Sequence, residues 1–177
     1  MKSSEYKRLV DEHKDRIYGH AFYFLGDRRD AEDVTQDVLI RAWENIGAIR
    51  RRKAKAWLMR ATHNLCIDYA RRISSRAKVV RSEDMSMLED RTVSSLRESN
   101  PEQLMEDAVL SGQILSALQQ LPPSLRSVIM LREIEDMKYK DISRVLGLPL
   151  NTVKVYIHRG RQELKTALGA LLAEETG

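Results

Sequence analysis

The chain has 177 residues, of which 42% are hydrophobic and 32% charged, and its formal net charge is +4. This balance supports folded cores and excludes wholesale disorder, while an aromatic content of 6% with few Gly and Pro residues favours helices over a β-sandwich. One cysteine excludes a disulfide framework, and the absence of an apolar run of ~18 residues or a signal-peptide core predicts a cytoplasmic protein without a membrane span.

The first helices follow from apolar side chains at helical spacing. Residues 6–25 form the first such stripe, and Gly26 is expected to end that helix. Asp30 is expected to cap the second helix, which runs to about Asn45. Its predicted buried stripe includes Trp43. A third helix is expected over about residues 53–73, and three helices of this kind make a compact all-α domain.

Charge is unevenly distributed over this first domain. Residues 27–37 are rich in acids, whereas residues 41–72 carry nine basic side chains and only two acids. The loop between the second and third helices contains the triplet Arg50-Arg51-Arg52, and three adjacent arginines repel one another unless a polyanion is present. An acidic surface beside a basic one therefore predicts two different partners, one of which is a polyanion.

The remainder of the chain predicts a linker and a second helical domain. Residues from about 74 to 100 show no sustained period and are rich in Ser, Arg and acids, which indicates a flexible linker. Pro101 marks a new helix start, and further helices are expected up to Leu121 and over residues 124–134. We therefore predict an all-α protein with two small helical domains, residues 1–75 and 101–177, joined by a linker of residues 76–100.

The end of the second domain has the layout of a helix-turn-helix. Gly147 is placed to end a short helix, Asn151 is placed to cap the next one, and apolar residues repeat along both. The opposite face of the second helix carries basic side chains that could enter a major groove: Lys154, His158, Arg159 and Arg161. The alternative is an amphipathic helical hairpin with a solvated basic face.

No motif predicts catalysis. His63 and Cys66 lie three residues apart on a helix, but two ligands do not make a metal site. Glycine-rich phosphate loops and nucleophile elbows are missing from the sequence. We therefore predict no enzyme activity, no cofactor and no bound metal.

Several motifs match one family in both domains. They are residues 30–38 (DAEDVTQDV) running into Arg41-Ala42-Trp43, Ala56-Trp57-Leu58 with Ala61, Asn64, Asp68 and Arg71-Arg72, Leu121-Pro122 with Arg126, and the helix-turn-helix with Thr152-Val153-Lys154 and His158-Arg159. With these motifs in this order, the whole chain resembles an extracytoplasmic-function (ECF, group IV) sigma factor of the sigma-70 family, a promoter-specificity subunit of bacterial RNA polymerase.

The resemblance implies a role for each surface. The acidic second helix would dock on the clamp helices of core RNA polymerase through Asp33, Gln36, Asp37 and Arg41. The basic loop and third helix would read the melted −10 element as a single strand through Arg50, Arg51, Arg52, Lys53, Lys55, Arg60, His63 and Asn64. The C-terminal domain would sit on the polymerase flap and read the −35 element through Asn151, Thr152, Lys154, Val155, His158, Arg159 and Arg161. A cognate anti-sigma factor is also implied.

Three positions of the last helix depart from the family pattern. Val155 and Tyr156 stand where a small polar and a basic residue are usual, and Gly160 replaces an alanine. A glycine there is expected to weaken the helix by ~1 kcal/mol. The alternative function is an autonomous helix-turn-helix regulator with an N-terminal sensing domain, but such a domain has no need of an acidic docking face.

Overall fold

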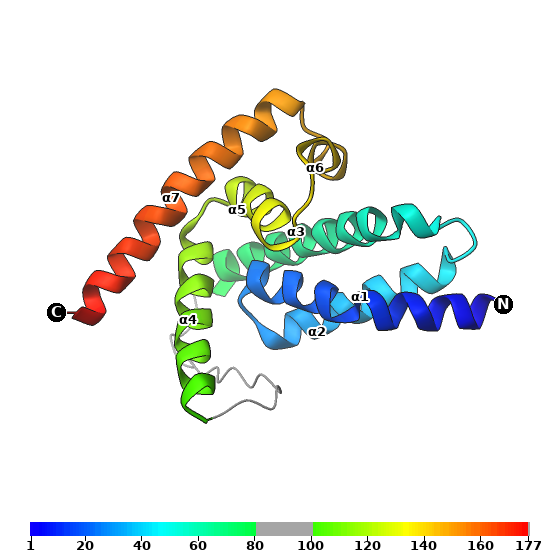
Figure 1. Cartoon of the computed structure of the whole chain (residues 1–177), viewed down its shortest axis with the longest axis horizontal. Coiled ribbons are helices and arrows are strands. Elements are labelled where there is room, and N and C mark those ends of the chain that lie inside the picture. Colours follow the sequence, from blue (N-terminus) through cyan, green and yellow to red (C-terminus); the bar gives the residue numbers. More distant parts are fainter. Residues whose placement is uncertain (81–100, 177) are drawn as a thin grey trace.

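A computed structural model describes residues 1–80 and 101–176, and these residues form helices, turns and short connections without a strand. The first domain consists of α1 (Lys2–Leu25), α2 (Arg28–Glu44), the 3₁₀ turn η1 (Arg51–Lys53) and α3 (Ala54–Val80). The second consists of α4 (Pro101–Gln120), α5 (Pro123–Ile129), the π-helical turn η2 (Met130–Ile134), α6 (Tyr139–Leu146) and α7 (Leu150–Thr176) (Figure 1). The predicted two-domain all-α fold is confirmed. Most of the predicted linker, residues 81–100, lies outside the described residues.

The start of α2 differs from the prediction. Gly26 ends α1 with φ +70°, as expected, and Asp27 follows directly in an extended conformation. The side chain of Asp27 accepts a hydrogen bond from the Asp30 backbone N–H at 2.9 Å. Asp27 is therefore the N-cap, and the prediction that Asp30 caps this helix was wrong because α2 begins two residues before it.

The turn of the helix-turn-helix confirms one prediction and corrects another. Gly147 ends α6 with φ +66°, which any other residue adopts only with strain. The carbonyl of Pro149 accepts the first helical bond of α7, from the Val153 N–H at 3.1 Å. Pro149 thus occupies the N-cap position, and Asn151 lies inside the first turn of α7 instead of capping it.

The helix predicted over residues 124–134 is not α-helical over its whole length. It is α-helical as α5 and then becomes the π-helical turn η2. The Glu135 N–H closes this turn on the Met130 carbonyl at 3.1 Å, and Asp136 then takes a positive φ of 51°. Short π-helical segments often mark functional positions. Here the extra residue in the turn places Glu135, 4% exposed, against the first domain.

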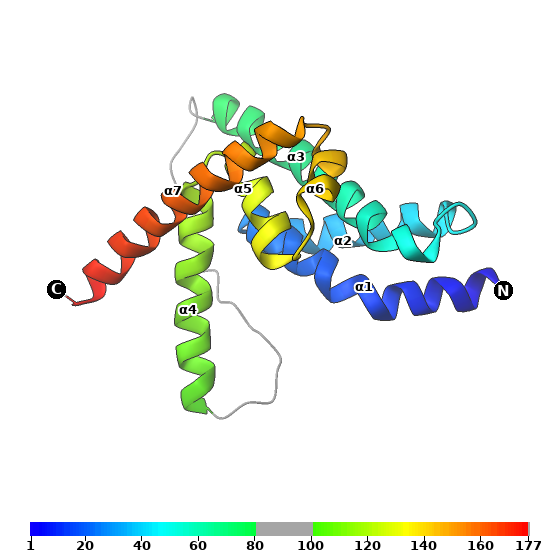
Figure 2. The same ribbon diagram turned by 45° about the horizontal axis from the view of Figure 1, so that its top comes forward.

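The two domains pack on one another. One continuous apolar core contains Phe24 of α1 and Leu58 of α3 together with Leu118 of α4 and Ile142 of α6. Contacts join α1 to α4 and α3 to α6, so that α6 lies beside α3 (Figure 2). The helices of the second domain therefore do not stand apart from those of the first.

Candidate nucleic-acid interface

The outer face of α2 is acidic and exposed. Asp33, Gln36 and Arg41 are exposed and Asp37 is half-buried, so all four predicted docking residues share this surface. The same face carries one large apolar side chain that the sequence analysis did not single out, Ile40, which is 55% exposed. A partner that binds here meets both carboxylates and apolar surface.

Trp43 was predicted to lie in the core, and this was wrong because 48% of its surface is exposed. The Trp43 ring packs edge-to-face against the Tyr6 ring of α1, with the ring centroids 5.1 Å apart. The Tyr6 hydroxyl in turn donates to the Leu39 carbonyl at 3.2 Å. This pair holds the indole at the surface beside Ile40. Helical spacing alone could not predict this position of Trp43, because the residue that packs on it, Tyr6, is distant in sequence.

The basic loop forms one wall of a cavity. Arg50, Arg51, Arg52 and Lys53 are all exposed around the turn η1. Between this loop and α1 lies a cavity of about 320 Å³, whose lining residues are Glu5, Arg8, Leu9, Glu12, His13, Ile46, Gly47, Ile49, Arg50, Arg51 and Ala54. Charged or titratable side chains make up about half of this lining, so the cavity is more polar than most small-ligand pockets, and its volume lies at the lower end of their range.

The predicted strand-reading residues of α3 divide into two groups. Arg60 and Asn64 are exposed. His63 is 8% exposed, and its ring meets the Phe24 ring edge-on with centroids 6.1 Å apart. Burial lowers the pKa of His63 to about 4. The Lys55 ammonium donates to the Glu135 carbonyl of the second domain. The structure therefore brings only part of this set to the surface.

The face of α7 that is predicted to read duplex DNA, called the reading face, is exposed. Asn151, Lys154, Val155, His158 and Arg159 are exposed, Thr152 is half-buried, and Val153 and Ile157 anchor the helix in the core. Arg161 is exposed but engaged, because its Nε donates to Glu133 Oε1 at 2.6 Å. This ion pair ties α7 to η2 and sets the direction of the Arg161 side chain.

Comparisons with known proteins place both domains in one family. The family description "Sigma-70 region 2" matches residues 9–76, and "Sigma-70, region 4" matches residues 111–164. The chain is 35% identical over 169 residues to the ECF RNA polymerase sigma factor SigW of Bacillus subtilis, covering 90% of this chain and 87% of that protein. The chain belongs to the ECF RNA polymerase sigma factors. These matches support the sigma-factor prediction over the autonomous regulator.

Further relatives agree with this assignment. The sigma factor is 38% identical over 160 residues to the ECF sigma factor SigE of Mycolicibacterium smegmatis, covering 90% of this chain and 60% of that protein. Its fold is similar to that of the sigma factor RpoE solved with the anti-sigma factor NepR from Bartonella quintana, with TM-score 0.69, 22% identity and coverage of 92% and 96%. It is also similar to CnrH, solved with the cytosolic domain of CnrY, with TM-score 0.62, 25% identity and coverage of 93% and 88%.

The described residues contain neither a group of metal ligands nor a membrane-spanning helix. Among them, no three His, Cys, Asp or Glu side chains are grouped so that they could hold a metal ion. None of the helices in the part of the sigma factor that the structure describes is long and apolar enough to cross a membrane.

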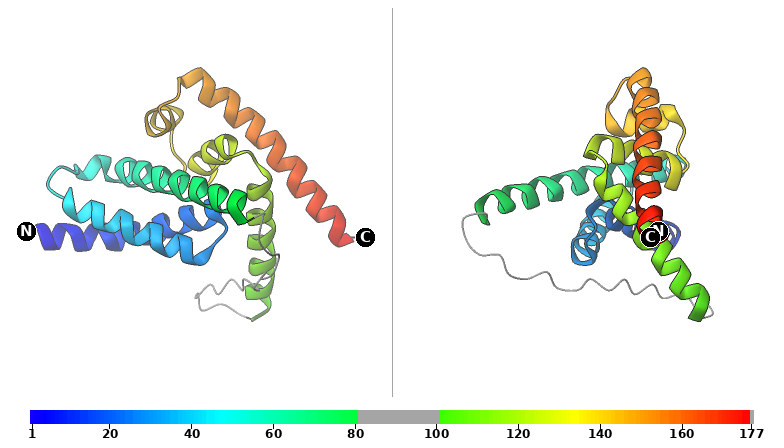
Figure 3. Two further views of the ribbon diagram at one scale, coloured as in Figure 1. Left: turned by 180° about the vertical axis from the view of Figure 1, so that it is seen from behind. Right: turned by 90° about the vertical axis from the view of Figure 1, so that its left-hand side faces the viewer.

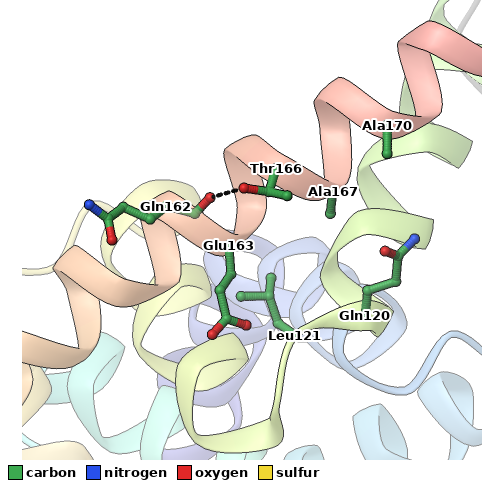
Figure 4. A pocket seen from close by; sticks show the side chains of 7 residues that line it. All are labelled: Gln120, Leu121, Gln162, Glu163, Thr166, Ala167 and Ala170. Carbon is green, nitrogen blue, oxygen red and sulfur yellow. Dashed lines mark hydrogen bonds between the residues drawn. The ribbon is translucent and has the colours of Figure 1, made fainter.

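In the second domain, α4 and α7 meet and then diverge (Figure 3). A groove lies between them. Its volume is about 320 Å³. Gln120, the last residue of α4, and Leu121 directly after it face Glu163, Ala167 and Ala170 of α7 across it (Figure 4). Leu121 and the two alanines provide an apolar floor, and the polar side chains form the rim.

Gly160 has a packing role that the sequence analysis did not detect. A Cβ atom at this position would lie 2.5 Å from Ile129 Cγ1 of α5. The glycine therefore lets α5 and α7 approach closely beneath the reading face. This close contact between the two helices offsets the lower helix propensity of glycine.

We expect Gly160→Ala to destabilise the sigma factor by up to ~2 kcal/mol, because an overpacking cost of ~1–3 kcal/mol outweighs the gain of ~1 kcal/mol in helix propensity. Gly169→Ala is the matched control on the same helix, since nothing lies within 4 Å of its Cβ position. That control should be neutral or stabilising in urea unfolding. Adding Ile129→Val should recover part of the loss, and equal stability of the two alanine variants would refute the packing role.

Proposed function

We propose that this sigma factor works in the cytoplasm without catalysis of its own, by directing core RNA polymerase to promoters and stabilising the opened strand. The observation that carries the proposal is the separation of charge within one small domain. The acidic face of α2 (Asp33, Gln36, Asp37, Arg41) and the exposed basic loop (Arg50 to Lys53) suit a protein partner and a polyanion respectively. The protein partner can therefore bind the acidic face while the polyanion binds the basic loop.

The cavity beside the basic loop suits an unstacked base of the melted −10 element. Leu9, Ile46 and Ile49 offer apolar surface to a base, and the carboxylates of Glu5 and Glu12 can accept hydrogen bonds from its amino groups. Arg50 and Arg51 line the same cavity and can hold the adjoining phosphates. Arg60 and Asn64 continue the exposed surface along α3. We assign the path of the single strand to this surface.

The C-terminal domain is proposed to read duplex DNA at the −35 element. Lys154, His158 and Arg159 can reach base edges or phosphates from the exposed face of α7, and the methyl groups of Val155 can contact a thymine methyl. Arg161, held by Glu133, is suited to a fixed phosphate contact. Asn151 and Thr152 lie in the first turn, where backbone N–H groups also favour phosphate.

Two protein partners are proposed besides the clamp. We assign the groove between α4 and α7 to the flap of core polymerase, because its apolar floor and polar rim suit a short helical segment. A cognate anti-sigma factor is supported by the RpoE structure, which was solved in complex with one.

Charge reversal at Asp33 and Asp37 is expected to weaken binding to core polymerase at least about tenfold, because close charge pairs across interfaces contribute more than 1.4 kcal/mol. Binding would be measured by fluorescence anisotropy, and helicity by circular dichroism. The matched control reverses Asp11 and Asp15, which are also exposed, acidic and four residues apart, but lie on α1. Undiminished affinity of the folded Asp33/Asp37 variant would remove α2 from the docking surface.

A further inference from the structure

The reading face of α7 carries an apolar side chain in the middle of polar ones. Val155 is 47% exposed. Asn151 and Arg159, four residues before and after it, and His158, three residues after it, are exposed on the same face. A single exposed apolar residue is common on protein surfaces. This one differs because polar groups that suit nucleic acid surround it, so a duplex bound to them also covers Val155.

The packing of α7 fixes the position of Val155. Val153 and Ile157, two residues before and after it, are buried and anchor the opposite side of the helix. Valine is branched at Cβ, and in a helix its side chain keeps almost a single χ1 rotamer. The two methyl groups of Val155 therefore stand at a fixed place on the reading face, whereas the long side chains of Lys154 and Arg159 can adapt to many partners.

Two neighbouring side chains of α7 are engaged by other parts of the second domain. Gln162 Nε2 lies 3.2 Å from His158 Nε2, which turns the His158 ring toward the C-terminal part of α7. Arg161 Nε donates to Glu133 Oε1 at 2.6 Å. Val155 lies on the N-terminal side of both, so its methyl groups stay accessible to a ligand.

The major groove offers one kind of apolar group to such a side chain. Base edges there carry hydrogen-bond donors and acceptors, and the exception is the C5-methyl group of thymine. A donor or acceptor covered by the Val155 methyl groups would lose water without gaining a partner, which is unfavourable. A pyrimidine C5-methyl group pays no such penalty and gains apolar contact.

We propose that Val155 makes α7 select a pyrimidine with a C5-methyl group at one position of the −35 element. Thymine is then bound there in preference to uracil, and 5-methylcytosine in preference to cytosine. The inference rests on the proposed duplex-reading function of α7 and names the chemical group that this helix takes. It also gives the sigma factor a response to DNA modification, because methylation of a cytosine at that position raises affinity without a change of sequence.

The test removes the methyl group from the DNA and the apolar group from the protein in turn. Holoenzyme formed from core polymerase and the full chain first selects a duplex from a promoter library randomised over the −35 element. Each thymine of the selected element is then replaced singly by uracil, which lacks only the C5-methyl group. Val155→Ser removes the apolar contact. Ile73→Ser is the matched control, because Ile73 is also branched at Cβ and 45% exposed but lies on α3.

Binding of fluorescein-labelled duplex by the wild-type holoenzyme should weaken about fourfold with uracil at one position, the factor expected for one buried methyl-sized group. A 5-methylcytosine–guanine pair at that position should bind more tightly than a cytosine–guanine pair by a similar factor. Both differences should persist in Ile73→Ser and vanish in Val155→Ser. The salt dependence of binding should be equal in all three proteins, because no charge changes.

A selected element without a uracil-sensitive thymine, or equal sensitivity in Val155→Ser and the wild type, would overturn the selection. Preference for thymine over uracil without preference for 5-methylcytosine over cytosine would overturn the C5-methyl group as the ligand. A duplex with a scrambled −35 element separates these results from failure of the proposed function. If the scrambled duplex binds as well as the selected one, α7 is not the −35 reader and both proposals fall, whereas weaker binding leaves the proposed function standing.

Discussion

Alanine at Arg50, Arg51 and Arg52 is expected to abolish most promoter opening while leaving the closed complex largely intact. The three side chains are exposed around η1, and we propose that they act on a strand that exists only after melting. If all three contact phosphates, their loss should flatten the salt dependence of single-strand binding by about two log units per log unit of salt, because each contact contributes about 0.7. Asn64→Ala should also reduce promoter opening.

Opening would be measured as permanganate reactivity near the start site with core polymerase present. A template that already contains a bubble should rescue the variants, because it removes the cost of unstacking. Alanine at Arg28 and Arg29, exposed arginines at the start of α2, is the matched control and should open the promoter normally. Equal losses of closed and open complexes, with no rescue by the bubble, would assign these arginines to duplex binding.

The second large effect concerns stability at mildly acidic pH. His20 is fully buried, stacks on Phe24, and has both ring nitrogens without a hydrogen-bond partner among the described residues. Burial, with a smaller contribution from nearby His63, lowers the pKa of His20 to about 3. Because the folded pKa is below the unfolded value of 6.5, the unfolded state binds protons first as pH falls. Stability is therefore present above pH ~6.5 and is lost below it.

Between pH 6.5 and 5, each of His20 and His63 should lower the free energy of unfolding by up to about 1.4 kcal/mol per pH unit. Burial raises the pKa of Glu135, so its own titration acts in the opposite direction and opposes part of this loss. His20→Leu should remove about half of the slope in urea unfolding, whereas His158→Leu, at an exposed position, should leave it unchanged. The same slope in His20→Leu as in the wild type would contradict this account.

The sequence by itself determined the helices, the two domains and the position of the helix-turn-helix. Periodicity and turn glycines are local signals, and Gly26 and Gly147 act within one turn of their own helices. The N-cap Asp27 was missed because Asp30 is an equally good cap by residue type, and Pro149 was missed because Asn151 is the better cap by residue type. The exposed acidic and basic surfaces were also predictable, since charged side chains rarely leave water without a partner.

Only the tertiary structure decided which apolar and polar residues contact one another across the chain. Trp43 is exposed because α1 covers it on one side only, and Gly160 is required because Ile129 of another helix lies against it. Lys55 and His63 look like their exposed neighbours in the sequence, but the Lys55 ammonium donates to the Glu135 carbonyl of the second domain and His63 is buried against Phe24 of α1. These features depend on residues brought together by packing of distant segments, and no local pattern of spacing or charge encodes such an approach.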